Sequence, residues 1–262
     1  MKKVNLFFVI LFSVLVFVAC EKDPEPEQPV VNAFQNQEFT VNGVAFKMIA
    51  VEHGFFIKWE KTEHMPNQPV LLTDDYYIGE TEVTQALWVA VMGENPSHYQ
   101  GSLQNPADSI SWYDCQRFLE KLNQLTGKEF RFPTEAEWEY AARGGKLNEP
   151  YAFSGSDNAA AVAWYKDNSG GETHPVAQLK PNGLGLYDMT GNVHEWCADE
   201  FPEAPQPNDT LVNPVFRGDT AQHVVKGGNF KKTVQNLPVS ELYVEETKAK
   251  VGSQGLRLAL SR

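Results

Sequence analysis

The segment GLYDMTGNVHEW, residues 185–196, is dense in glycine, carboxylate and aromatic side chains. An extended chain from Asp188 to Glu195 would span roughly 23 Å, so these two carboxylates meet only if the chain curls. Gly191 and Asn192 provide a turn, because both tolerate a left-handed backbone. On composition alone, Asp188 and Asn192 are turn formers and Glu195 is solvated, since carboxylates are mostly exposed.

The bulk composition fits a globular protein that does not bind nucleic acid. Among 262 residues, 42% are hydrophobic and 12% aromatic, which suits a packed core in one large domain or two small ones. The 34 acidic and 22 basic residues give a net charge of −12. A general nucleic-acid binder needs a basic face for the phosphates, so that class is excluded.

The first residues have the pattern of a lipoprotein signal peptide, residues 1–19. Lys2 and Lys3 precede an apolar run that ends at Ala19 and Cys20 and is shorter than the roughly 20 residues of a membrane span. A small residue before Cys20 resembles a lipobox, although Phe17 replaces the usual Leu. We expect Cys20 to be lipidated and to attach the protein to a membrane; an ordinary cleaved secretory signal is the alternative.

Residues 20–35 are expected to form a flexible tether behind the lipidated Cys20. EKDPEPEQP, residues 21–29, has several charges, three prolines and no apolar residue. An acidic run here resembles surface-export signals of some lipoproteins, and a plain spacer is the other interpretation. We expect an outer membrane lipoprotein that faces the periplasm or the cell surface.

Residues 36–262 show no second linker and predict one α+β domain with few helices, small antiparallel sheets and much irregular chain. FTVNGVAFKMIAV, residues 39–51, predicts a hairpin that turns at Asn42-Gly43. Helices are expected after Thr84, from Ser111 to about Leu125, and after Thr134, where Glu137 completes a capping box. Of the two cysteines after Cys20, Cys115 lies on an apolar helical stripe, which favours free buried thiols over a disulfide.

Several long motifs together resemble the formylglycine-generating enzymes and their sulfatase-modifying-factor relatives. The resemblance covers about residues 36–262 and implies the C-type-lectin-like variant of the α+β fold. The motifs, in chain order, are YYIGETEVTQALW, SISWYDC, RFPTEAEWEYAARGG, NGLGLYDMTGNVHEW, KGGNF and GLRLAL.

The resemblance also implies a structural calcium ion at the opening segment. Matched by position, its ligands would be the side chains of Asp188 and Glu195 and the backbone carbonyls of Gly191 and Val193. Calcium is a hard cation that takes six to eight oxygens of this kind. His194 stands where the family commonly has Trp, and we assign it no metal.

The family's copper-binding cysteine pair is missing from this chain. After Gly227-Gly228, the offsets of the active-site Ser and two Cys hold Asn229, Lys232 and Leu237. None can act as a thiolate ligand, so we expect no copper and no formylglycine formation. The six histidines show no HxxxH or HExxH spacing that would indicate another metal site.

A non-catalytic binding module is the function that remains. Residues 229–254 predict an irregular surface, which some lectin-like relatives use to bind ligands. Its candidate contact residues are Lys231, Lys232, Gln235, Glu241 and Tyr243. The ligand would be a protein or a glycan of the envelope, and a solvated loop without a partner is the bland alternative. A metal-dependent oxidoreductase or hydrolase with a relocated site, and a structural part of an envelope assembly, also remain open.

Overall fold

The structure, a computed structural model, describes residues 34–58, 67–201, 209–218 and 221–262. The expected signal peptide, Cys20 and nearly all of the expected tether lie outside the described residues. Phe34 to Arg262 form one unit, which begins two residues before the expected boundary. No helix in the described part of the chain is long and apolar enough to cross a membrane.

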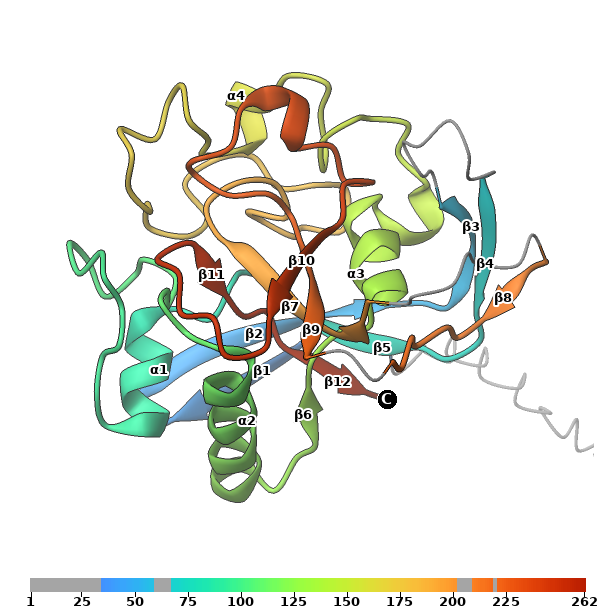
Figure 1. The fold of residues 1–262 in the computed structure, drawn as a ribbon. Coiled ribbons are helices and arrows are strands. Elements are labelled where there is room, and N and C mark those ends of the chain that lie inside the picture. Colours follow the sequence, from blue (N-terminus) through green and yellow to red (C-terminus); the bar gives the residue numbers. More distant parts are fainter. Residues whose placement is uncertain (1–33, 59–66, 202–208, 219–220) are drawn as a thin grey trace, which may run out of the picture. The chain divides into compact units, whose positions relative to one another are not determined.

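A five-stranded antiparallel sheet joins the two ends of this unit. Its first two strands form the predicted hairpin, in which Asn42 and Gly43 take positive φ angles of 47° and 83°. The C-terminal strand lies between strands from the middle of the sequence (Figure 1). The order is β1 (Gln37–Val41), β2 (Val44–Val51), β5 (Tyr76–Gly79), β12 (Ala259–Ser261) and β6 (Phe130–Arg131).

Two smaller sheets complete the β structure. One has the order β10 (Tyr243–Glu246), β9 (Gln222–Lys226), β7 (His194–Glu200) and β11 (Gln254–Gly255). The other has the order β3 (Gly54–Lys58), β4 (Gln68–Leu72) and β8 (Leu211–Val212). The sheets are mainly antiparallel, as expected, and the two short pairs β7–β11 and β4–β8 are parallel. Long crossings rather than hairpins bring these partners together, and only such connections allow parallel pairing.

The helices begin where the capping residues predict. The side chain of Thr84 accepts a hydrogen bond from the Leu87 amide, and Ser111 and Thr134 form complete capping boxes with Asp114 and Glu137. The helices are α1 (Gln85–Met92), α2 (Trp112–Thr126), α3 (Glu135–Ala142) and α4 (Ala159–Val162), with 3-10 turns η1 (Gly145–Leu147) and η2 (Val234–Asn236).

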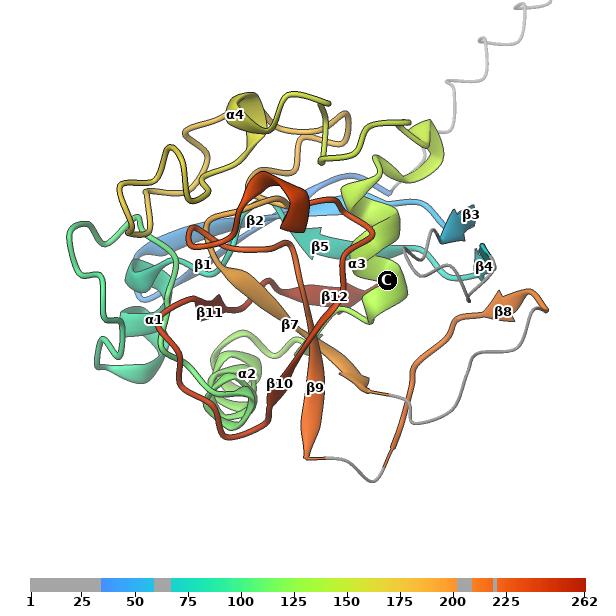
Figure 2. The same cartoon turned by 45° about the horizontal axis from the view of Figure 1, so that its top comes forward.

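Strand β7 runs between two apolar clusters. Trp196 packs with the buried faces of α1 and α2, including Phe118, while Cys197 belongs to the cluster around Trp138 of α3. Figures 1 and 2 show α2 and α3 on opposite sides of β7 and β9. Alternate residues of β7 therefore enter different clusters, and Glu195 points to the side of α3.

Candidate cation site and binding surface

The segment of residues 185–193 curls as its glycine and asparagine predicted. Asp188, Gly191 and Asn192 have positive φ angles of 56°, 86° and 53°. A Cβ atom at residue 191 would lie 2.3 Å from the Trp164 carbonyl oxygen, so only glycine fits there. The amides of Gly191 and Asn192 donate to the carbonyls of Gly227 and Trp164, at 2.7 and 2.8 Å. The turn therefore brings Asp188 close to β7.

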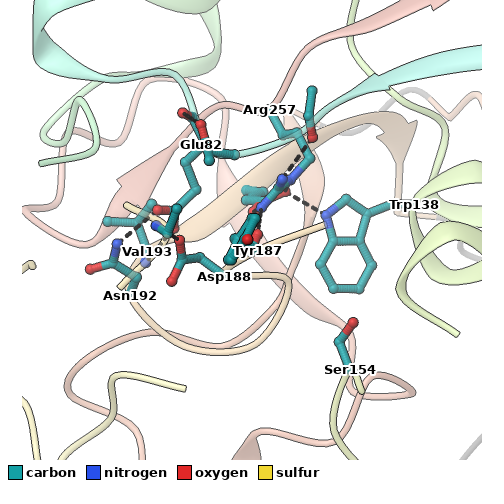
Figure 3. Close-up of polar contacts among 12 residues, drawn as sticks. Glu82, Trp138, Ser154, Tyr187, Asp188, Asn192, Val193 and Arg257 are labelled. Atoms are coloured by element: carbon teal, nitrogen blue, oxygen red, sulfur yellow. Dashed lines mark hydrogen bonds and ion pairs between the residues drawn. The ribbon is translucent and has the colours of Figure 1, made fainter. Parts of the chain in front are cut away.

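Glu195 is fully buried, so the interpretation of a solvated carboxylate is wrong. The Arg257 guanidinium donates from Nε to Oε2 at 2.8 Å and from Nη2 to Oε1 at 2.7 Å. The indole Nε1 of Trp138 donates to the same Oε2 at 2.5 Å (Figure 3). Both partners are themselves buried. This bidentate ion pair neutralises Glu195 within the protein.

Glu82 is a third buried carboxylate, which the sequence analysis missed. Its Oε1 accepts the Val193 amide at 3.0 Å, and its Oε2 accepts from Asn192 Nδ2 at 2.7 Å (Figure 3). Burial raises the pKa of Glu82 well above its ordinary value, and the charges of Asp188 and Glu195 add to the effect. Glu82 lies within the motif YYIGETEVTQALW, but nothing in that motif indicates that its carboxylate is buried.

Asp188 carries an oxygen without a partner. Its Oδ2 accepts the Ala177 amide at 2.7 Å, while Oδ1 is buried and has no hydrogen bond within the described residues. Burial raises the pKa of Asp188 to about 6. Such an orphaned buried acceptor is costly unless a water or an ion satisfies it.

The donors at this turn fit a hard cation in part. Asp188 Oδ1 is a free anionic oxygen, and the turn backbone offers carbonyls of the kind calcium prefers. Glu195 fits less well because Arg257 already holds both of its oxygens. In the described part of the chain, no three His, Cys, Asp or Glu side chains converge as a metal cluster. Backbone oxygens would therefore have to supply most of the coordination.

The family resemblance also implies a second calcium site before this turn, and the nearest stretch here is residues 164–175. Asn168 gives such a site no support. Its Oδ1 accepts the Tyr165 amide at 2.7 Å, and its Nδ2 donates to the Ala163 carbonyl at 2.9 Å. The side chain is thus occupied by its own turn. Asp167 is exposed.

The residues at the positions of the family's catalytic serine and cysteines make packing and hydrogen-bond contacts within the domain. Leu237 is 0% exposed and lies in an apolar cluster with Phe153, Ala159, Val162 and Ala163. The Lys232 ammonium lies 4.2 Å from the centroid of the Tyr243 ring, a cation–π contact. Asn229 is buried, and its Oδ1 accepts the Lys231 amide at 2.9 Å.

Both remaining cysteines are free and buried, as the apolar stripe predicted. Cys115 lies in the α1–α2 cluster and Cys197 in the α3 cluster, on the two sides of β7. Burial raises the pKa of both thiols well above the ordinary value. They do not form a thiolate pair that could replace the missing one.

The five predicted contact residues share one region but differ in exposure. Lys231 and Gln235 are exposed, whereas Lys232, Glu241 and Tyr243 are half-buried. The expected irregular surface also contains a short strand, because β10 runs through it and pairs with β9. We call residues 229–254 the variable face, because exposure and backbone conformation vary along it.

His194 lies beneath this variable face and was not predicted as a site residue. Its ring is 4.7 Å from that of Tyr243, and neither ring nitrogen has a hydrogen bond within the described residues. Burial, with a smaller effect from the Lys232 charge, lowers its pKa to about 3. The imidazole is therefore neutral at physiological pH.

A groove of about 1270 Å³ lies elsewhere and includes none of the predicted site residues. Its charged side chains mostly pair with each other. Arg131 forms a bidentate pair with Glu137 at 2.7 and 2.8 Å, and Asp75 accepts from His53 and Arg262. These pairs resemble a surface network more than a reaction centre.

Comparisons with known proteins identify one family for this chain. The family described as "Sulfatase-modifying factor enzyme 1-like domain" matches residues 34–262. "Chaperone protein LppX" of Paenibacillus barcinonensis is 30% identical, with 84% of this chain and 91% of that protein covered. The formylglycine-generating enzyme of Streptomyces coelicolor is 32% identical over 55% of this chain, which spans 50% of that enzyme.

A solved structure, Treponema denticola variable protein 1, has the same fold over nearly the whole chain. It superposes with a TM-score of 0.79 at 30% identity and covers 90% of this chain and 100% of its own. With the matched domain, these similarities confirm the fold expected from the motifs. The chain belongs to the sulfatase-modifying factor enzyme 1-like family.

Proposed function

We propose that this protein is a non-catalytic envelope lipoprotein that binds a partner through the variable face. The burial of Leu237 carries the proposal. At the offset where the family's enzymes place a copper-binding cysteine, this chain has a side chain packed in an apolar cluster. The other cysteine offset holds Lys232, whose ammonium repels a copper ion and rests on Tyr243. Redox chemistry at this place would need both residues replaced.

A protein is the partner class that the comparisons favour. One relative that is similar over most of its length is named a chaperone, a protein that acts on other proteins. The variable face offers the half-buried Tyr243, a residue type enriched at protein interfaces, and exposed Lys231 and Gln235 as a polar rim. Lipidation at Cys20 would hold this face close to an outer membrane, on its periplasmic or outer side.

Site-specific photocrosslinking in the intact, lipidated protein tests this function. A photoreactive residue at Lys231 or Gln235 should capture one defined protein, and the same residue at exposed Lys128, just after α2, should not. Tyr243→Ala should reduce the capture at least about fivefold, because aromatic anchors dominate interfaces. Equal capture at all three positions would show that the variable face is not the binding surface.

A direct assay tests the loss of catalysis. Purified protein, copper and a peptide with a sulfatase-type cysteine should yield no aldehyde above a protein-free control. The reason is that neither Lys232 nor Leu237 can supply a thiolate. Robust aldehyde formation would instead favour the alternative, an oxidoreductase with a relocated site.

We also propose that a calcium ion braces the turn at Asp188. The buried carboxylate of Asp188 and its unpartnered Oδ1 support a cation at this turn. Asp188 and the carbonyls of Gly191 and Val193 would hold it. Calcium at about 100 times its Kd stabilises the folded state by about 2.7 kcal/mol, equivalent to roughly 5–10 °C in Tm. Melting curves recorded in calcium and in excess chelator measure this shift. An unchanged curve would contradict the brace.

A further inference from the structure

The outer face of the β3–β4–β8 sheet consists of apolar side chains. Burial alternates along β3 and β4, so Phe56, Val70 and Leu72 point into the cluster around Trp138 and their neighbours point outward. The outward residues of the described strands are Phe55, Ile57, Pro69, Leu71 and Val212. The solvated face of such a sheet normally carries polar residues. This face therefore needs an explanation other than contact with water.

The strand register makes these side chains one continuous patch. Leu71 lies opposite Phe55 of β3 and beside Val212 of β8, and Ile57 lies opposite Pro69. Side chains at directly paired positions are in contact. Phe55 is 54% exposed and Val212 is 57% exposed, while the other three are half-buried. A contiguous exposed apolar patch marks contact with a protein or with a membrane.

The size of the patch favours a membrane over a protein partner or a second copy of the chain. Five side chains, three of them half-buried, offer far less than the about 800 Å² per partner that a stable protein interface buries. A contact this small persists only where another link already keeps the two surfaces together. The lipid expected at Cys20 is such a link, and it leads to a bilayer.

The expected anchor also keeps the patch within reach of the bilayer. The described chain begins at Phe34, 14 residues after Cys20, and 14 residues extend to at most roughly 50 Å. The Phe34 ring centroid lies 4.9 Å from the guanidinium carbon of Arg262, and Arg262 pairs with Asp75. Asp75 follows the end of β4 by three residues. The described domain therefore begins beside the segment that leaves the patch.

The charges near the patch favour a bilayer of zwitterionic lipids. Asp74 and Asp209 are exposed and lie two residues beyond β4 and two residues before β8. The whole chain carries a charge of −12. Anionic headgroups attract basic segments and repel acidic ones. The contact would thus depend on apolar burial and change little with salt.

We propose that the outer face of the β3–β4–β8 sheet rests on a zwitterionic phospholipid bilayer, with Phe55 and Val212 entering its interfacial layer. This inference rests on the lipid attachment proposed above. Figures 1 and 2 show β3, β4 and β8 on the opposite side of the domain from α1 and β11. The contact therefore leaves the part of the variable face near β11 free for a partner.

Reconstitution of the full lipidated protein into phosphatidylcholine vesicles tests the contact. Because Cys115 and Cys197 are buried, an environment-sensitive dye reacts with one introduced thiol, Val212→Cys or, on exposed α2, Tyr113→Cys. Doxyl-labelled phosphatidylcholine should quench the dye at position 212 at least about twofold more than at 113, because an interfacial apolar face enters the bilayer by roughly 5–10 Å.

A charge placed in the patch should remove this difference. Phe55→Asp should lower the quenching at position 212 to the level at 113. The matched control is Leu103→Asp, at an apolar residue that is 56% exposed elsewhere, and it should leave the quenching unchanged. The comparison of the two dye positions needs no charged variant, so it decides even if Phe55→Asp fails to fold.

The outcomes separate this inference from the lipoprotein proposal. Mass spectrometry that finds no lipid on Cys20 would refute both. With the lipid present, equal quenching at the two dye positions would overturn the bilayer contact and leave the lipoprotein proposal standing. Quenching that disappears at high salt would indicate an electrostatic contact and overturn the apolar one. A dye signal that depends on protein density in vesicles without quencher would identify a second copy as the occupant and likewise overturn the inference.

Discussion

Single residues distinguish this domain from the enzymes of its family at the position of their active site. A fully buried leucine and a lysine resting on tyrosine occupy the two cysteine offsets. Leu237 now contributes to the stability of the fold, because its neighbours in α4 and the preceding loop depend on it for contacts. At this position the chain has a core residue.

Leu237→Ala should therefore destabilise the protein by about 2–5 kcal/mol, through lost apolar burial and the cavity that remains. Gln235→Ala, two residues away and exposed, should change stability by less than about 0.5 kcal/mol. Urea unfolding at equilibrium measures both values. Similar values for the two variants would show that Leu237 is not packed as described.

The sequence predicted the turn at the cation site but not the residues that close it. Positive φ angles at Gly191 and Asn192 follow from their own chemistry, so local reasoning finds them. Arg257 and Glu195 are in contact although they are 62 positions apart in the sequence. Glu82 and Val193 are in contact across 111 positions. Charged side chains are expected to be solvated, and only the folded chain shows that these three are not.

Elements with their own capping or turn signals were predictable, whereas short strands were not. The hairpin at Asn42-Gly43 and the helices after Thr84, Ser111 and Thr134 all form where expected. Strands β8, β10 and β11 have two to four residues and exist only through their neighbours. Tertiary pairing, rather than local preference, defines them.

The capping box at the start of α3 is expected to contribute to the stability of the folded protein. Thr134→Ala removes the acceptor for the Glu137 amide and should cost about 1 kcal/mol, equivalent to roughly 2–4 °C in Tm. Thr134→Ser keeps the hydroxyl and should melt within about 1 °C of wild type. Differential scanning calorimetry of the three proteins tests this, and equal losses in both variants would point to the lost methyl group instead.

At the scale of the whole molecule, several charged side chains among the described residues are buried beside the apolar clusters. Lys58 and Lys226 flank Glu135 at 2.8 and 3.0 Å, and Lys226 also contacts Glu139 at 2.9 Å. Burial alone would raise the pKa of Glu135, but the two ammonium groups outweigh it and lower the pKa to about 2. Stability from this network is present above the ordinary pKa of glutamate and is lost only as pH falls toward 2.

At milder acidity we expect His223 to contribute to the pH dependence of stability. It is buried against Trp112, with ring centroids 4.1 Å apart, and burial lowers its pKa from 6.5 to about 4. The folded state binds fewer protons than the unfolded state in this window, so stability falls as pH drops from 6.5 to 4.

Replacing the imidazole with a neutral amide isolates this contribution. His223→Gln should show a shallower loss of stability between pH 6.5 and 4 than wild type, whatever its stability at pH 7. Urea midpoints across this range measure the difference in slope. Parallel curves for the two proteins would mean that His223 titrates normally when folded.

The position of β12 has a consequence for how the chain matures. Strand β12 lies between β5 and β6, and Arg257, only two residues before it, neutralises Glu195 near the start of β7. Neither the largest sheet nor that buried charge pair can form before residues 257–261 have been synthesised. Strands β5 and β6, made much earlier, therefore wait for a distant part of the chain before their sheet is complete.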